Sequence, residues 1–221
     1  MATSVEKYRV FWADKATPLA NDSPASRSLL AQELRLLYSD WSPIHVLEIG
    51  CGNGRLFDDL GFPPASYRGV DFGPRMLESF HASHPDLDLV QAEGSSYCDE
   101  RSYDLIFSNG VIQNFSRDML DRHFRNARTM MHDASRLVCA GVPWRALRPE
   151  YDLGLFSPGG RASAVRRLEN QVLRLLGRDL MGVWYQPEEI AVLARKHGLA
   201  ARFHGSVAEP YRFHVVMSVN G

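Results

Sequence analysis

The stretch Val46-Leu-Glu-Ile-Gly-Cys-Gly-Asn-Gly-Arg55 decides the fold of this chain. It begins as a short apolar run and passes directly into three glycines at alternate positions, Gly50, Gly52 and Gly54. A buried parallel strand is typical of such a run. Glycine lets the following loop approach a ligand closely or adopt a positive φ. With a helix expected over residues 55–60, the stretch predicts a strand, a loop and a helix that together bind a nucleoside-like cofactor.

The spacing of the glycines separates two classes of cofactor. The dinucleotide fingerprint G-x-G-x-x-G needs a glycine where this chain has Arg55, and it places a pyrophosphate at the helix start. Here the pattern is G-x-G-x-G, and Glu48 stands two residues before the first glycine. A carboxylate there suits a cationic ligand better than a phosphate. The pattern resembles motif I of the class I S-adenosylmethionine (SAM) methyltransferases, and the resemblance implies cofactor contacts for Glu48, Gly50, Cys51 and Gly52.

A second acid follows at the expected distance. Residues 67–71 are typical of a short strand that ends in Asp71, before a helix start that contains Pro74. Asp71 lies 21 residues beyond Gly50, and an acid about 20 residues past the glycine loop binds ribose hydroxyls in doubly wound folds. The alternative is that Asp71 only caps the helix; the offset favours ribose. The segment also resembles motif II, which implies cofactor contacts for Phe72 and for Met76, the latter on the adenine.

Two further strands each end in polar or glycine-rich segments. A third strand over residues 87–91 leads to Glu93, Gly94 and Ser95. The resemblance implies that Glu93 accepts a hydrogen bond from the adenine amino group and that the backbone at the next two residues meets the ring edge. The alternative for Glu93 is an exposed loop acid.

Residues 103–115 predict a fourth strand and its loop, and they resemble motif IV, with a structural role for Asp104. The end of this strand is where ligands bind in open α/β sheets. We therefore expect cofactor contacts there from Ser108, Asn109 and Gly110.

The remaining pattern completes a doubly wound α/β fold with a seven-stranded, mostly parallel sheet and an antiparallel C-terminal strand. Helices are predicted over residues 26–38, 116–131 and 187–197, and strands over 136–142, 199–207 and 211–219. The last two strands are close enough to form a hairpin. A dinucleotide domain has no need of a hairpin, whereas the resemblance implies one beside the fifth strand.

The chain is expected to form one methyltransferase domain over residues 1–221. Its predicted parts are an N-terminal arm or lid (1–23), a SAM-binding core (24–142), a variable acceptor-site insertion (143–183), and a closing helix with hairpin (184–221). The arm and the insertion are hypothesised to cover the acceptor pocket; ordinary packing is the alternative. The candidate acceptor-binding residues are Tyr8, Trp12, Gln113, Asn114, Trp144 and Arg145.

Composition argues against several other classes. The 25 Lys and Arg residues against 26 Asp and Glu give a net charge of −1, whereas a nucleic-acid enzyme needs a basic surface. No apolar run is long enough to span a membrane. The three cysteines lack C-x-x-C spacing, which indicates reduced thiols in a cytoplasmic protein and no metal site. The pattern assigns no oligomeric state.

These observations predict a SAM-dependent methyltransferase that acts on an oxygen or nitrogen atom of a small-molecule acceptor. Methyl transfer from a sulfonium depends mainly on alignment of the two partners. A base is needed only if the acceptor must lose a proton, and none of the eight histidines has a spacing that singles it out. The alternatives are a non-catalytic SAM- or nucleoside-binding protein and an NAD-type oxidoreductase.

Overall fold

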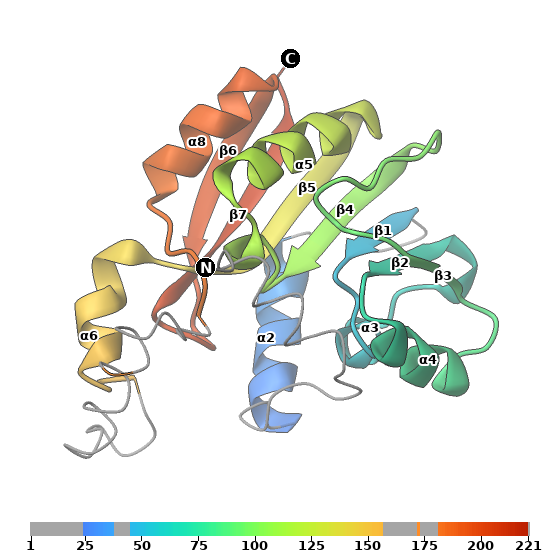
Figure 1. Ribbon diagram of the computed structural model, residues 1–221, viewed down its shortest axis with the longest axis horizontal. Helices are drawn as coiled ribbons and strands as arrows, with labels where there is room; N and C mark the ends of the chain where they lie inside the picture. Colours follow the sequence, from blue (N-terminus) through green and yellow to red (C-terminus); the bar gives the residue numbers. More distant parts are fainter. Residues whose placement is uncertain (1–23, 38–44, 157–171, 173–180, 221) are drawn as a thin grey trace.

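The computed structural model describes residues 24–37, 45–156, 172 and 181–220. In this part of the chain one mixed sheet runs in the order β3-β2-β1-β4-β5-β7-β6 (Figure 1). The strands are β1 (Val46–Ile49), β2 (Tyr67–Asp71), β3 (Asp88–Gln91), β4 (Tyr103–Asn109), β5 (Met131–Pro143), β6 (Leu199–Gly205) and β7 (Arg212–Val219). Strands β1 to β5 are parallel, and β7 is antiparallel to both β5 and β6. The predicted fold class, including the closing hairpin, is confirmed.

The order of the strands fixes where a ligand can bind. The chain moves outward from β1 through β2 to β3, and then returns to place β4 on the other side of β1. All four residues of β1 are buried, as expected of a central strand covered on both faces. At such a switch point the connections leave in opposite directions and open a crevice at the carboxyl ends of the strands.

Helices cover both faces of the sheet (Figure 1). One buried cluster packs α5 (Arg117–Thr129) and α8 (Pro187–Lys196) against the sheet, and the other packs α2 (Pro24–Leu37), α3 (Arg55–Leu60) and α4 (Pro74–Ser83). Short 3-10 turns occupy Pro64–Ser66, Ile112–Asn114 and Arg145–Leu147, and α6 spans Arg148–Asp152. No described helix is long and apolar enough to cross a membrane.

One predicted boundary was wrong. The helix expected to reach residue 131 ends at Thr129, and β5 begins at Met131, so His132 lies on a strand and not on a helix. Polar contacts hold it there: its amide donates to Ser135 Oγ at 2.8 Å, and its Nε2 lies 2.9 Å from Asp104 Oδ1. Asp104 also accepts the amide of His45 at 2.7 Å. Asp104 therefore has the structural role that was expected of it.

Two predicted features fall outside the described residues. The N-terminal arm with Tyr8 and Trp12 lies there, as does most of the apolar helical pattern within the insertion. The described start of the insertion, through residue 156, contains α6 and packs Tyr151 against the rings of Trp184 and Tyr211 at centroid distances of 5.3 and 4.7 Å.

Candidate functional site

The glycine loop after β1 turns across the end of β2. The amides of Gly50 and Cys51 both donate to the carbonyl of Val70, at 2.6 and 3.1 Å. The φ angles of Gly50, Gly52 and Gly54 are 77°, 56° and 81°, a region that side chains disfavour. The loop conformation therefore requires glycine at all three positions.

The three glycines nevertheless have different surroundings. A Cβ on Gly54 would lie 2.1 Å from the ring of Phe80, and one on Gly50 would lie 2.4 Å from Val111 Cγ2. At these two positions neighbouring side chains of the protein leave no room for a further atom. A Cβ on Gly52 would meet no described atom within 4 Å. The open space beside the loop is therefore at Gly52, and Cys51 is buried beneath it.

Asp71 joins the glycine loop to the end of β2. Its Oδ2 accepts the amide of Gly52 at 3.0 Å, and its Oδ1 accepts the amide of Gly73, the residue that precedes α4, at 2.8 Å. Burial raises the pKa of this carboxyl, and the two amides partly offset that rise. Asp71 thus accepts a hydrogen bond at the start of α4, as expected if it caps this helix. Each carboxylate oxygen keeps a second lone pair, so ribose hydroxyls can bind as well.

Glu48 points into the core beneath the loop. It is 2% exposed, and its Oε2 accepts the hydroxyl of Tyr67 at 2.6 Å. Burial raises the pKa of Glu48 to about 7, the bond from Tyr67 lowers it in part, and the charge of Asp71 adds to the rise. The structure gives this carboxylate a partner inside the protein, and its contact with a cationic ligand stays a prediction.

The buried carboxyl of Glu48 predicts a specific pH dependence of stability. Its pKa is about 7 in the folded protein and 4.5 ordinarily, so between these values the folded state holds a proton that the unfolded state lacks. The free energy of unfolding therefore decreases as pH rises from about 4.5 to 7, by about 3 kcal/mol. Glu48→Gln should remove this loss, because the amide oxygen still accepts the Tyr67 hydroxyl.

Urea denaturation at pH 5 and pH 8 measures the effect. We expect Glu48→Gln to be more stable than the original protein at pH 8 and similar to it at pH 5. Glu78→Gln, which changes an exposed glutamate on α4, is the matched control and should follow the original protein at both values. An identical pH dependence in all three proteins would contradict the assignment.

The loop after β3 is held by hydrogen bonds between its own residues. Glu93 Oε1 accepts the amide of Ser95 at 2.9 Å, its Oε2 accepts the Ser95 hydroxyl at 2.5 Å, and Arg122 lies 3.8 Å away. Ser95 is fully buried. Its amide donates to Glu93 within the loop, and the expected contact of the backbone at Gly94 and Ser95 with the adenine edge stays a prediction. Glu93 is half-buried and partnered, so its alternative as a free surface acid was wrong.

Neighbouring residues at this edge have mixed environments. A Cβ on Gly94 would lie 2.5 Å from Ile49 Cγ2, so close packing on β1 requires glycine there. Met76 on α4 is buried and Phe72 is half-buried. Phe72 follows Asp71 directly and Met76 lies in the first turn of α4, and their expected contacts with the nucleoside stay predictions.

The end of β4 contains buried oxygen atoms without donors. Ser108 Oγ, Asn109 Oδ1 and Asn114 Oδ1 have no hydrogen-bond partner within the described residues. Gly110 has φ 65°, and a Cβ there would meet no described atom within 4 Å. Buried polar atoms are normally hydrogen-bonded. Unpaired acceptors beside open space therefore fit a ligand that brings donors, such as an amino group.

Two of the acceptor-site candidates bind other residues of the protein. Trp144 Nε1 donates to Gln186 Oε1 at 3.1 Å, and Arg145 Nη2 contacts Glu189 Oε2 at 2.5 Å. Gln186 and Glu189 form the capping box of α8. The polar groups of Trp144 and Arg145 thus hold the start of this helix, and the acceptor roles of these two residues stay predictions.

The candidates after β4 do lie at the crevice, with a residue that sequence reasoning missed. Gln113 Oε1 accepts from Arg212 Nη1 at 2.6 Å, and Asn114 Nδ2 lies 3.4 Å from the carbonyl of Gly110. Arg212 begins β7 and is buried. No local pattern indicates it, since it stands 99 residues from Gln113.

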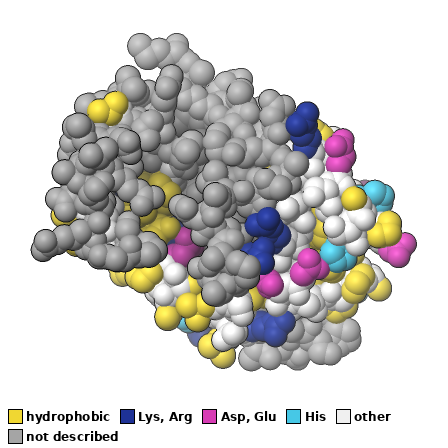
Figure 2. Space-filling model, turned by 90° about the horizontal axis from the view of Figure 1, so that it is seen from below, with side chains coloured by type: hydrophobic (Ala, Val, Ile, Leu, Met, Phe, Trp, Pro, Cys, Tyr) yellow, Lys and Arg dark blue, Asp and Glu magenta, His cyan; other side chains and the backbone are white. Residues whose placement is uncertain are grey.

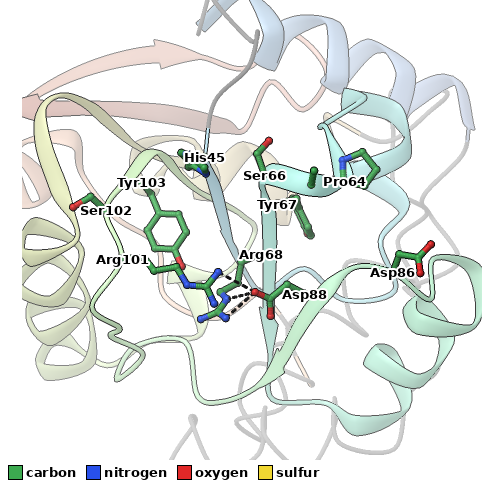
Figure 3. A pocket seen from close by; sticks show the side chains of 11 residues that line it. His45, Pro64, Ser66, Tyr67, Arg68, Asp86, Asp88, Arg101, Ser102 and Tyr103 are labelled. Carbon is green, nitrogen blue, oxygen red and sulfur yellow. Dashed lines mark hydrogen bonds and ion pairs between the residues drawn. The ribbon is translucent and has the colours of Figure 1, made fainter.

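A cavity of about 270 Å³ lies at the opposite, amino-terminal edge of the sheet. Figure 3 shows Arg68 and Arg101 converging there on Asp88, with N–O distances of 2.7 and 3.0 Å. A second carboxylate, Asp99, also binds Arg68 at 2.7 Å. Because these charges are paired with one another, and ligands bind open α/β sheets at the carboxyl ends, this cavity is not the candidate site.

Comparisons with known proteins agree with the geometry. A family model described as a methyltransferase domain matches residues 46–133. A trans-aconitate 2-methyltransferase from Methylobacterium radiotolerans is 36% identical over 123 residues, which are 48% of this chain and 47% of that protein. Malonyl-[acyl-carrier protein] O-methyltransferase 1 from Ilyobacter polytropus is 32% identical over 31% of this chain and 28% of its own length. The matched regions thus span about half or less of these relatives.

Solved structures extend the likeness of fold to nearly the whole chain. The CcbJ methyltransferase from Streptomyces caelestis has a TM-score of 0.63 at 16% identity and covers 96% of each chain. The magnesium protoporphyrin IX methyltransferase from Synechocystis, with bound SAM, has a TM-score of 0.66 at 9% identity and covers 100% of this chain and 99% of its own. The glycine loop, the strand order and the closing hairpin are those of this fold, residues 46–133 match a methyltransferase domain, and the matches together support a class I SAM-dependent methyltransferase.

Proposed function

We propose that this protein is an enzyme that binds SAM in the crevice at Gly52 and Asp71 and transfers its methyl group to a small molecule. One observation carries the proposal. A single carboxylate, Asp71, binds both the glycine loop and the start of α4, at a point where Gly52 faces open space. An acid at the tip of the second strand beside an open glycine is the arrangement that holds a nucleoside sugar.

The crevice residues fit the parts of this cofactor. Asp71 would accept the ribose hydroxyls, and the space at Gly52 would admit the ligand against the backbone. The unpaired oxygens of Asn109 and Asn114 would accept from the amino group. Phe72, Met76 and Gly94 would border the adenine, with Glu93 near its amino group. When bound, SAM supplies a methyl group on a positively charged sulfur, which a nucleophile can attack directly.

The residues of the protein contribute mainly positioning. The buried His123 packs against Phe115, and burial lowers its pKa to about 4, so its ring is neutral at pH 7. His123 is therefore given no role as a base. An acceptor whose nucleophile is already deprotonated, such as a carboxylate, needs no base. The crevice would then act by aligning acceptor and methyl group and by excluding water.

The acceptor is proposed to be a small molecule methylated at oxygen or nitrogen. The relatives described above are named for trans-aconitate and for malonyl-[acyl-carrier protein], which supports an acidic metabolite over a polymer. On the face seen in Figure 2, basic and acidic side chains of the described residues lie close to one another. The cytoplasmic location and the division of residues 1–221 into arm, core, insertion and closing hairpin stay proposals.

Incubation with methyl-labelled SAM and a panel of small acids, phenols and amines tests this function. We expect label to move to at least one acceptor, and calorimetry to show SAM binding without acceptor. Binding without transfer to any acceptor would favour the non-catalytic alternative. Binding of NAD in place of SAM would favour the oxidoreductase and would overturn the proposal.

A further inference from the structure

Arg212 is a buried cation at the carboxyl edge of the sheet. Its side chain is 10% exposed, and its Nη1 donates to Gln113 Oε1 and to the carbonyl of Gly141. Gly141 lies directly beside the end of β4, because a Cβ there would be 2.7 Å from Asn109 Oδ1 and 3.3 Å from the amide of Gly110. The guanidinium therefore lies next to the residues that border the crevice.

One edge of this guanidinium lacks conventional hydrogen bonds. Nε has no hydrogen-bond partner among the described residues, although Glu209 Oε2 lies 3.2 Å away. Nη2 lies 4.0 Å from the sulfur of Met181, and a thioether is only a weak acceptor. Buried donors are normally paired. The Nε and Nη2 hydrogens thus form a fork that can bind two oxygen atoms when an incoming anion displaces Glu209 from Nε.

The local charge indicates which anion fits. Beside Arg212 stand the carboxylate of Glu209, the ring of Tyr211 at 5.2 Å, and His214. Burial lowers the pKa of His214, and Glu33, whose Oε1 lies 3.4 Å from its Nε2, partly offsets that decrease. Because Glu209 already offsets part of the Arg212 charge, a group with one negative charge is expected to bind there better than a group with two. A planar, singly charged carboxylate matches the fork in both shape and charge.

We propose that Arg212 determines acceptor specificity by binding a carboxylate group of a small organic acid through Nε and Nη2. Gln113 and the carbonyl of Gly141 hold the guanidinium in place, and the fork presents the acid beside Asn109 and Gly110. The inference rests on the proposed function, since it assumes that the methyl acceptor enters at this end of the crevice.

Calorimetric titration of the protein saturated with S-adenosylhomocysteine tests the inference without turnover. The probes are succinate, citrate and benzoate, their uncharged counterparts succinamide, triethyl citrate and benzamide, and phenyl phosphate. We expect at least one carboxylate to bind more than tenfold more tightly than its uncharged counterpart. Arg212→Gln should weaken that binding about 10- to 100-fold, as the loss of a charge-assisted pair implies.

Two further variants separate recognition from structure. Arg202→Gln changes an exposed arginine on β6 of the same hairpin and should leave carboxylate affinity unchanged. Glu209→Gln removes the competing carboxylate, while its amide oxygen can still accept the Tyr211 hydroxyl that Glu209 Oε1 binds at 2.9 Å. We expect Glu209→Gln to strengthen carboxylate binding severalfold, an effect that a purely structural role of Arg212 does not produce.

The outcomes are distinguishable. Failure of S-adenosylhomocysteine to bind would count against the proposed function itself. If it binds, the inference is overturned when the carboxylates bind no better than their uncharged counterparts, when phenyl phosphate binds more tightly than the carboxylates, or when Arg212→Gln has no effect. If Arg212→Gln does not fold, Glu209→Gln decides: a gain in affinity supports the inference, and no change or a loss overturns it.

Discussion

Asp71→Ala is expected to weaken SAM binding at least 100-fold. The change removes the carboxylate proposed to accept the ribose hydroxyls, and hydrogen bonds to a charged group contribute about 1.5–3 kcal/mol each. Two such bonds correspond to a loss of about 3 kcal/mol or more, which is roughly a hundredfold in Kd. The glycine loop also loses the hydrogen bond from the Gly52 amide to Asp71. Affinity is therefore lost both because the ribose loses its acceptor and because the loop is held less firmly.

Calorimetry with SAM measures this effect, and thermal unfolding shows whether the variant is folded. The two freed amides are expected to cost about 1–3 kcal/mol of stability, well short of unfolding a stable domain. Asp133→Ala, at an exposed acid on β5, is the matched control and should bind SAM normally. A folded Asp71→Ala protein with unchanged affinity would contradict the ribose assignment.

The pKa of Asp71 adds a pH dependence to the same binding. Burial raises this pKa above the ordinary 3.8, and protonation removes the charge that strengthens hydrogen bonds to ribose. SAM affinity should therefore decrease with falling pH, beginning at a higher pH than for an exposed aspartate. Calorimetric titrations over an acid pH series measure it; an affinity constant down to pH 4 would contradict this expectation.

Gly54→Ala is expected to lower mainly the stability of the protein, and Gly52→Ala mainly its affinity for SAM. At Gly54 a methyl group would lie 2.1 Å from the ring of Phe80 with φ at 81°, so strain and overpacking together should cost about 3 kcal/mol of stability. At Gly52 the methyl group meets no described atom within 4 Å, and the φ of 56° costs about 1 kcal/mol. The Gly52 variant should remain folded but bind SAM at least tenfold more weakly.

Urea denaturation and SAM titration of both variants check this pair, each variant serving as control for the other. Stability should fall mainly in Gly54→Ala and affinity mainly in Gly52→Ala. Normal SAM affinity in Gly52→Ala would show that the open space beside this glycine does not hold the cofactor.

The fold could be predicted because its signals are local. The apolar β1 run, the glycines after it and the acid at the end of β2 lie within 30 residues and fix one strand–loop–helix unit and its neighbour. The closing hairpin was recognisable from two strand patterns that are too close together for a helix between them. The wrong boundary of α5 arose because His132 contacts Asp104, 28 residues away, which a local helical pattern does not contain.

The site was less predictable because its polar groups bind partners that are distant in the sequence. The sequence around Glu48 does not indicate that Tyr67 of the neighbouring strand donates a hydrogen bond to it. The sequence around Arg145 likewise does not indicate its contact with Glu189, 44 residues later. Arg212 carries no local signal, because Gln113 and Gly141 stand 99 and 71 residues away.

A crystal structure of the protein with S-adenosylhomocysteine tests the central claim most directly. It should show the ribose hydroxyls on the Asp71 carboxylate and the ligand passing over Gly52 at the carboxyl ends of β1 and β4. A ligand in the cavity between His45 and Arg68 at the opposite edge, or an empty crevice that instead admits a pyrophosphate dinucleotide, would contradict it.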